Sequence, residues 1–554
     1  MFPKNAKRFR FTDGILLLAI LLVGGFHEYV SCILAAAMSV WLLIRLARQK
    51  KLSVQKDLLT CAMAAVSLGY GLTCLWGIDR GMALVGFLKF LPLLLYLLCL
   101  QQEDAPGRAL EALPWFGVAL AAISAVGMQF PKAEIWFAVD GRLSGTFQYP
   151  NTFAVFLLVC ELLVLKKQGK KIWDYFLMLL LIVGMLYTGS RTAFLVAILA
   201  NAVMLLAITR KKTRLIALIA MAVCLVGLLV GLRTVPILQR YLRFSLTENS
   251  VVTRLLYWTD ALKLLVKYPF GMGFMGYFYA QQQVQTGLYS VMYLHNDFLQ
   301  LFLDVGLIPT GLFVAALGKW FFKKSIPLTD KIIVGAVCLH SFCDFDLQYI
   351  GIFMLLVLLL SGEKTDKRIV LKAQLPLKLS FGAVTLASLY LGVSLMASHL
   401  INPRIADKLY PYDTRNKLSI LEQETRVTEA NEIADSILKQ NTHFYAPYNI
   451  KAKYYYTKGQ FGPMIENAKK ALERNPFNHT AYQTYCEMLF TGIDLYQKIG
   501  DTQSVEIFKQ EILAMYRQFL ANKDRLSKLG SMIREQPVLE LPAELVTAIQ
   551  ALEP

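Results

Sequence analysis

The sequence predicts an all-α membrane protein with about 13 transmembrane helices and a smaller helical domain at its C-terminal end. Of its 554 residues, 56% are hydrophobic, which is too many for a soluble chain of this length. Hydrophobic stretches of roughly 20 residues, the length that crosses the hydrocarbon core of a bilayer, recur as far as residue 400. Clusters of lysine and arginine separate these stretches in pairs, as expected of a chain that crosses a membrane repeatedly.

Each predicted transmembrane helix is a hydrophobic run bounded by polar or turn-forming residues. The predicted spans are 14–27, 29–47, 57–76, 82–101, 111–129, 150–166, 172–188, 191–208, 214–232, 298–319, 328–344, 348–361 and 379–398.

The first two spans could instead form one tilted helix over residues 14–46. His27 and Glu28 would then lie at the centre of the bilayer, where charged and polar groups are costly. The basic clusters before and after this stretch must also lie on the same side of the membrane. We therefore expect a hairpin of two helices.

The basic clusters also predict which side each loop occupies, because short cytoplasmic loops retain lysine and arginine while translocated loops avoid them. With the N-terminus in the cytoplasm, the tail after about residue 400 is extracytoplasmic. The other external segments are 77–81, 130–149, 189–190, 233–297 and 345–347. The formal net charge of +18 then reflects orientation and contact with anionic lipids, and not nucleic-acid binding.

The long loop 233–297 contains a predicted amphipathic helix. Over residues 251–268, Leu255, Leu262 and Leu265 share one helical face, whereas the charged side chains lie elsewhere, and Pro269 ends the pattern. Such a helix is suited to lie on the membrane surface.

Residues 401–554 form the predicted second domain, distinct from the transmembrane domain 1–400. The segments 434–448 and 468–482 share Ala, Leu, Asn and Tyr at matching positions, 34 residues apart. This period is typical of tetratricopeptide repeats, in which stacked helix pairs bury a shared core. Such an array either binds a protein partner or serves as a spacer.

The sequence offers little that would bind a metal. Most of the nine cysteines lie within hydrophobic runs, and their spacing suggests neither a metal site nor a disulfide framework. Asp344 and Asp346 form a D-x-D pair near the outer surface, where cytoplasmic nucleotide sugars cannot reach them. We expect them to cap a helix or to pair with an arginine, and we expect His340 to be packed within its helix.

Four groups of polar residues lie in the external segments, at the ends of helices. They are Arg142 to Asn151, the Ser190-Arg191 turn, Arg254 with the glycine-rich turn after Pro269, and His295-Asn296-Asp297. Taken singly, each has a simple structural explanation. A lone arginine at a membrane edge often reaches to the interface, and Asn296 could cap the helix that follows His295.

Together, these four groups resemble the O-antigen ligase/polymerase superfamily of bacterial membrane glycosyltransferases, in order, spacing and sidedness, over roughly residues 10–365. The resemblance implies a GT-C-like, multi-pass protein of the cytoplasmic membrane that serves cell-envelope polysaccharide biosynthesis. It also implies a glycan donor linked to undecaprenyl diphosphate, and a glycan, lipid or protein acceptor outside the membrane. A tetratricopeptide tail outside this core occurs in some family members.

The resemblance also assigns roles to residues, with no cofactor and no metal. It implies that His295 is the catalytic base and that Arg142, Arg191 and Arg254 bind the donor diphosphate. Supporting positions are Asn151, Ser190, Asn296 and Asp297. These residue types suit the chemistry, because arginine forks bind phosphate oxygens and histidine accepts a proton near neutral pH.

Three acceptors remain open within the family: a lipid core for a ligase, the growing chain for a polymerase, and a protein hydroxyl for an oligosaccharyltransferase. Two other classes compete with an enzyme. A transporter of lipid-linked glycans would carry ionisable residues or broken helices near the bilayer midplane, and a silent scaffold would act through its repeats alone.

Overall fold

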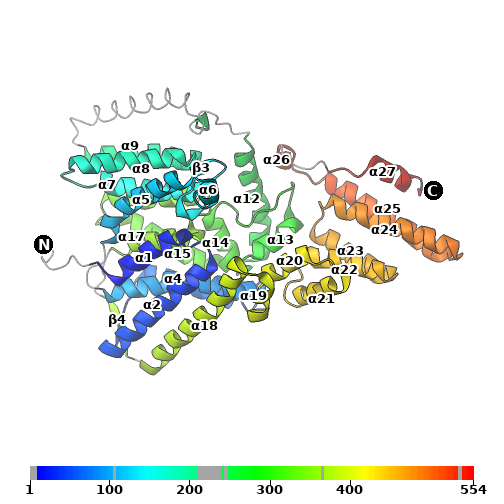
Figure 1. Ribbon diagram of the computed structural model, residues 1–554, viewed down its shortest axis with the longest axis horizontal. Helices are drawn as coiled ribbons and strands as arrows, with labels where there is room; N and C mark the ends of the chain where they lie inside the picture. Colours follow the sequence, from blue (N-terminus) through cyan, green and yellow to red (C-terminus); the bar gives the residue numbers. More distant parts are fainter. Residues whose placement is uncertain are drawn as a thin grey trace. The chain divides into compact units, whose positions relative to one another are not determined.

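The computed structural model describes residues 9–103, 108–209, 239–241, 248–362, 367–372, 374–533 and 539–553. Over these residues the chain is helical apart from short strands (Figure 1). It divides into two compact units. The first unit comprises Met1–Leu72, Leu84–Ser245 and His295–Met396, and the second comprises Thr73–Ala83, Leu246–Leu294 and Ala397–Pro554.

Five described helices are long and apolar enough to cross a membrane, which agrees with a multi-pass protein. They are α2 (Glu28–Gln49), α4 (Arg80–Gln102), α5 (Ala109–Gly127), α9 (Arg191–Ile208) and α18 (Gln374–Leu400). Shorter apolar helices accompany them: α1 (Phe11–Leu21), α3 (Leu58–Leu72), α7 (Pro150–Leu165), α8 (Ile172–Tyr187), α15 (Leu307–Phe322) and α17 (Ile350–Leu360). The first unit also contains α6 (Pro131–Phe137), α14 (Asp297–Val305), α16 (Leu328–Ser341) and the 3₁₀ turns η1 (Val23–Gly25), η2 (Gly145–Phe147) and η4 (Asp346–Gln348).

One predicted span is wrong. The segment 298–319 is not a single helix, because α14 and α15 meet at Gly306, whose φ of +85° lies outside the helical region. Gly306 ends α14, donating its N–H to the carbonyl of Phe302. The predicted span 214–232 lies outside the described residues, so the count of 13 stays a prediction.

The predicted hairpin at the N-terminus is confirmed. Helix α1 ends at Leu21, the η1 turn follows, and α2 begins at Glu28. Lys89 of α4 is fully buried beside this turn; its ammonium donates to the carbonyl of Phe26 at 3.1 Å and lies 3.7 Å from the Glu28 carboxylate. The polar residues of the turn therefore have a buried cationic partner.

Loops that the basic clusters assign to the cytoplasm meet at one end of the first unit, which we call the basic end. There β1 (Leu52–Gln55) pairs antiparallel with β4 (Arg368–Leu371), with Leu52 opposite Leu371. Lys166, at the end of α7, pairs with Asp330, in the first turn of α16, at 2.7 Å. Segments joined by such bonds must lie on one side of a membrane, so these contacts agree with the predicted alternation.

In the second unit, residues Thr73–Ala83 and the helices α12 (Asn249–Lys267) and α13 (Gly276–Val284) accompany the C-terminal helices. Buried Asp79 accepts hydrogen bonds from the hydroxyl of Thr414 and from Asn441 at 3.2 Å, and the N–H of Ile78 donates to the carbonyl of Met272. The C-terminal helices are α19 (Pro403–Leu409), α20 (Thr414–Gln423), α21 (Val427–Leu438), α22 (Ala446–Thr457), α23 (Phe461–Arg474), α24 (His479–Lys498), α25 (Thr502–Lys523), α26 (Lys528–Ser531) and α27 (Ala543–Gln550).

Two of these helix pairs carry the predicted repeat at equivalent places. Ala434 in α21 and Ala468 in α23 are buried, as are Tyr448 in α22 and Tyr482 in α24. The positions that recur after 34 residues therefore fill the core of this region. The assignment to tetratricopeptide repeats stays a prediction.

The helix predicted over 251–268 is present as α12. Its buried face includes Val252, Leu256 and Leu264, whereas Leu255 and Leu262 are exposed. An apolar stripe is thus left on the outer side of the helix, as a surface helix needs. Its contact with a membrane stays a prediction.

Candidate active site

Arg142 is positioned by a tight β-hairpin. The strands β2 (Ala138–Val139) and β3 (Arg142–Leu143) pair antiparallel, and Asp140 and Gly141 between them both have positive φ, as a two-residue turn of this kind requires. The guanidinium of Arg142 donates through Nε to the carbonyl of Thr188 at 2.8 Å, and through Nη2 to Oδ1 of Asn151 at 2.7 Å. Arg142 therefore joins β3 to the turn before α9 and to the first turn of α7.

A second arginine reaches the same turn. Gly189 has a φ of +61°, and a Cβ built there would lie 3.3 Å from Cδ of Arg240 and 3.5 Å from Nε of Arg142. Burial lowers the pKa of Arg142, and the positive charge of Arg240 lowers it further. Two cations around one glycine, half-buried Arg142 and exposed Arg240, make a site that an anion would stabilise. The sequence assigned no role to Arg240, because it is one of several arginines in the long loop 233–297 and stands in no motif.

Asp344 connects Arg142, through Asn151, to His295. Its carboxylate accepts from Nδ2 of Asn151 at 2.7 Å, the hydroxyl of Tyr149 at 2.8 Å and the backbone N–H of Phe345 at 3.0 Å, and its Oδ1 lies 3.1 Å from Nδ1 of His295. Asp344 is fully buried, and such a set of donors suits an ionised carboxylate. Its expected partner was an arginine, but Asn151 stands between Asp344 and Arg142.

His295 is held in an unusual backbone conformation. Its φ is +51°, a left-handed value that costs a non-glycine residue about 1–3 kcal/mol and is typical of functional sites. Its ring packs edge-on against Phe345, with the ring centres 4.9 Å apart. Asn296 follows and caps α14, with Oδ1 accepting from the N–H of Leu299. When Nδ1–H donates to Asp344, Nε2 is the nitrogen that can accept a proton.

Asp297 and Asp346 form a neighbouring buried layer. Oδ2 of Asp297 accepts from the N–H of Leu347 at 2.7 Å, while Asp346 accepts from Thr152 at 2.8 Å and lies 2.6 Å from Nδ1 of His340. Burial raises the pKa of Asp297 well above its usual range, and the Asp346 carboxylate raises it further. His340 is fully buried, in agreement with a packed, hydrogen-bonded residue. Among the described residues, no group of His, Cys, Asp and Glu is arranged to hold a metal ion.

The remaining expected residues are placed as follows. Ser190 caps α9, its Oγ accepting from the N–H of Ala193, and half-buried Arg191 is the first residue of that helix, two positions after Gly189. Arg254 lies on α12 in the second unit, where Nη1 donates to the carbonyl of Ser250. The first unit thus brings Arg142, Asn151 and His295 into one network, with Arg191 in the adjoining turn.

Residues 176–314 match the family model described as O-antigen ligase. The match covers Ser190, Arg191 and His295, but Arg142, Asn151 and Asp344 lie outside it. No curated protein matches the sequence.

Proposed function

Because the chain carries an O-antigen ligase domain, a glycosyltransferase type, and has several membrane-spanning helices, we propose that it transfers a glycan from undecaprenyl diphosphate to an acceptor. The reaction takes place at the outer face of the bacterial cytoplasmic membrane and serves the synthesis of cell-surface polysaccharide. The observation that carries the proposal is the continuous network from Arg142 through Asn151 and Asp344 to His295.

In the proposed reaction, the arginines bind the donor diphosphate. Transfer breaks the bond between the anomeric carbon and the diphosphate oxygen, and the leaving group gains negative charge as the bond breaks. Arg142 and Arg240 lie around one turn and repel each other when no anion is present. A diphosphate would turn this repulsion into two charge-assisted interactions, with Arg191 at the same turn as a third ligand. This mechanism requires no metal.

His295 would act as the general base. The acceptor hydroxyl oxygen attacks the anomeric carbon, its proton passes to Nε2 of His295, and the diphosphate leaves with the electron pair of the broken bond. Asp344 would position His295 by holding Nδ1 and would stabilise the imidazolium that forms. Asn151 orients both Arg142 and Asp344, and Asn296 and Asp297 fix the backbone on either side of the site.

We further propose that Arg254 is an additional diphosphate ligand and that the C-terminal repeats bind a protein partner. A polymerase that extends the glycan and a protein O-oligosaccharyltransferase would use the same donor chemistry. A transporter of lipid-linked glycans is the competing class. The polar network described above lies in loops and at the ends of helices and not at their centres, which favours an enzyme.

The deciding experiment reconstitutes the purified full chain with an undecaprenyl-diphosphate-linked glycan and candidate acceptors in detergent micelles. We expect release of undecaprenyl diphosphate without any transmembrane gradient, with no loss of activity when EDTA is added. Movement of intact donor across sealed vesicles, with no diphosphate released, would instead identify a transporter. The acceptor that increases release distinguishes ligase, polymerase and protein transferase.

A further inference from the structure

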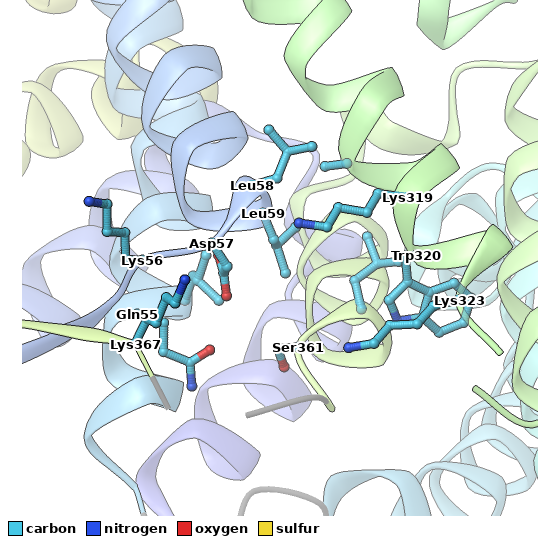
Figure 2. A pocket seen from close by; sticks show the side chains of 13 residues that line it. Gln55, Lys56, Asp57, Leu58, Leu59, Lys319, Trp320, Lys323, Ser361 and Lys367 are labelled. Atoms are coloured by element: carbon cyan, nitrogen blue, oxygen red, sulfur yellow. The ribbon is translucent and has the colours of Figure 1, made fainter. Parts of the chain in front are cut away.

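A cavity of about 530 Å³ opens at the basic end of the first unit, between residues far apart in the sequence (Figure 2). The segment from Gln55 to Leu59 at the start of α3 forms one side, and Lys319, Trp320 and Lys323 at the end of α15 form another. This cavity belongs to none of the chemistry proposed above.

Its lining is strongly cationic. Lys56, Lys319, Lys323 and Lys367 line it together with one carboxylate among the described residues, Asp57. The carboxylate is itself engaged, because Oδ1 of Asp57 accepts from the N–H of Thr60 at 2.7 Å and so caps α3. Within the described part of the chain, Lys319 makes no ion pair.

Trp320 adds a second, independent sign of a ligand. Its side chain is only 8% exposed and lines the cavity, yet its Nε1–H has no hydrogen-bond partner among the described residues. A buried donor without an acceptor is costly, and a ligand oxygen in the cavity would remove that cost.

Apart from Gln55 and Ser361, the rest of the lining is apolar. Leu58, Leu59, Leu97, Ala316 and Leu360 contribute from α3, α4, α15 and α17, all of which are apolar helices. In Figure 2 the ammonium groups of Lys319 and Lys323 extend toward the side formed by Asp57 and Lys367. A ligand for this site therefore needs an anionic head that accepts hydrogen bonds and an apolar part.

We propose that this cavity binds the phosphate head group of an anionic phospholipid of the inner leaflet. The basic clusters place this end of the chain at the cytoplasmic surface, where anionic lipids are available and basic pockets between helices bind their head groups. Lys319 and Lys323 contact the phosphate, and Nε1–H of Trp320 donates to one of its oxygens. The proposal stands independently of the glycosyl transfer at the other end of the unit.

The test measures lipid bound to the purified full chain by native mass spectrometry during titration with phosphatidylglycerol, phosphatidylcholine or inorganic phosphate. We expect saturable binding of phosphatidylglycerol and weaker binding of phosphatidylcholine. Lys319→Gln and Lys323→Gln should each weaken phosphatidylglycerol binding about five-fold, and Trp320→Phe, which keeps an aromatic ring, should weaken it roughly ten-fold.

Lys331→Gln is the matched control, because Lys331 lies in α16, outside the cavity lining, and should bind as the parent does. Equal binding of both lipids, or parental binding by the three cavity variants, would overturn the proposal. Inorganic phosphate that binds alone and displaces phosphatidylglycerol at equal concentration would show a soluble phosphate ligand and would overturn the lipid assignment. A variant with lowered thermal stability is judged by its preference between the two lipids, which a folding defect alone would not change.

Discussion

At the scale of single residues, the pairing of His295 with Asp344 leads to the sharpest prediction. Asp344→Asn would replace the oxygen near Nδ1 with a group that can also donate, which favours the wrong imidazole tautomer. We expect His295→Ala and Asp344→Asn to lower transfer by about 10²–10⁴-fold, as measured by release of undecaprenyl diphosphate.

Tyr149→Phe is the matched control, since it removes the hydroxyl that donates to Asp344 and accepts from Asn151 but keeps the ring stacked on Phe345. Its activity should fall less than that of Asp344→Asn, because the Asp344 carboxylate stays in place and keeps its other donors, Asn151 and the backbone N–H of Phe345. A shift in the pH dependence of activity in Asp344→Asn would show that Asp344 acts by positioning His295. If His295→Ala keeps activity within a few-fold, His295 is not the base.

The arginines give a second prediction at this scale. Arg142→Lys and Arg240→Lys keep the charge but lose the planar fork, and Lys cannot donate to Thr188 and Asn151 together as Arg142 does. We expect each variant to lower kcat/KM about 10²-fold. Arg404 is an exposed arginine that pairs with Glu424, and Arg404→Lys should leave kcat/KM unchanged. If Arg142→Lys and Arg240→Lys both keep the parental kcat/KM, the diphosphate binds elsewhere.

At the scale of helices and strands, hydropathy predicted the five described helices that are long enough to cross a membrane, because the apolar length of such a helix is set by the bilayer. The predicted span 191–208, for example, is the observed α9. The break at Gly306 was missed because apolar residues continue on both sides of it and the period alone gives no backbone angle. The strand pair β1–β4 was missed because two four-residue strands, more than 300 residues apart, carry no joint signal.

Local sequence patterns predicted some of the site residues but not their connection. Arg142, Asn151 and His295 each stood in a recognisable short motif at a helix end. Asp344 joins them through contacts 193 and 49 residues along the chain, and no local pattern encodes such a connection. Its role was therefore visible only once the fold brought α7, α14 and the segment after α16 together.

Element packing also gives a prediction in the second unit. A Cβ at Gly81, near the start of α4, would lie 1.9 Å from the carbonyl oxygen of Tyr412. Gly81→Ala should therefore displace the 73–83 segment from the C-terminal helices and lower stability by about 1–3 kcal/mol. Gly462→Ala in α23, where nothing lies within 4 Å, is the control and should be neutral or mildly stabilising. Limited proteolysis and thermal unfolding would measure both, and equal behaviour of the two variants would contradict the packing.

At the scale of the whole molecule, one compact unit contains residues 73–83, the α12–α13 region and the tail. Contacts of Ile78 with Met272 and of Asp79 with Thr414 require all three segments to share one side of the membrane. The basic clusters assign the loop at 77–81 to the extracytoplasmic side, so the α12–α13 region and the C-terminal helices should lie there as well. The number of spans between residues 209 and 248 does not affect this placement.

Cysteine labelling in intact cells tests this arrangement. In a cysteine-free background, Ser290→Cys and Gln460→Cys, both at exposed positions of the second unit, should react with a membrane-impermeant maleimide. Lys170→Cys, at a half-exposed position between α7 and α8, should react only after permeabilisation. Labelling of position 290 but not of 460 would place the tail in the cytoplasm, which the bonds between Asp79, Thr414 and Asn441 forbid in a folded chain. If only position 170 is labelled in intact cells, the topology is the inverse of the predicted one. His295 and its network would then lie at the cytoplasmic face, where the proposed acceptors are absent.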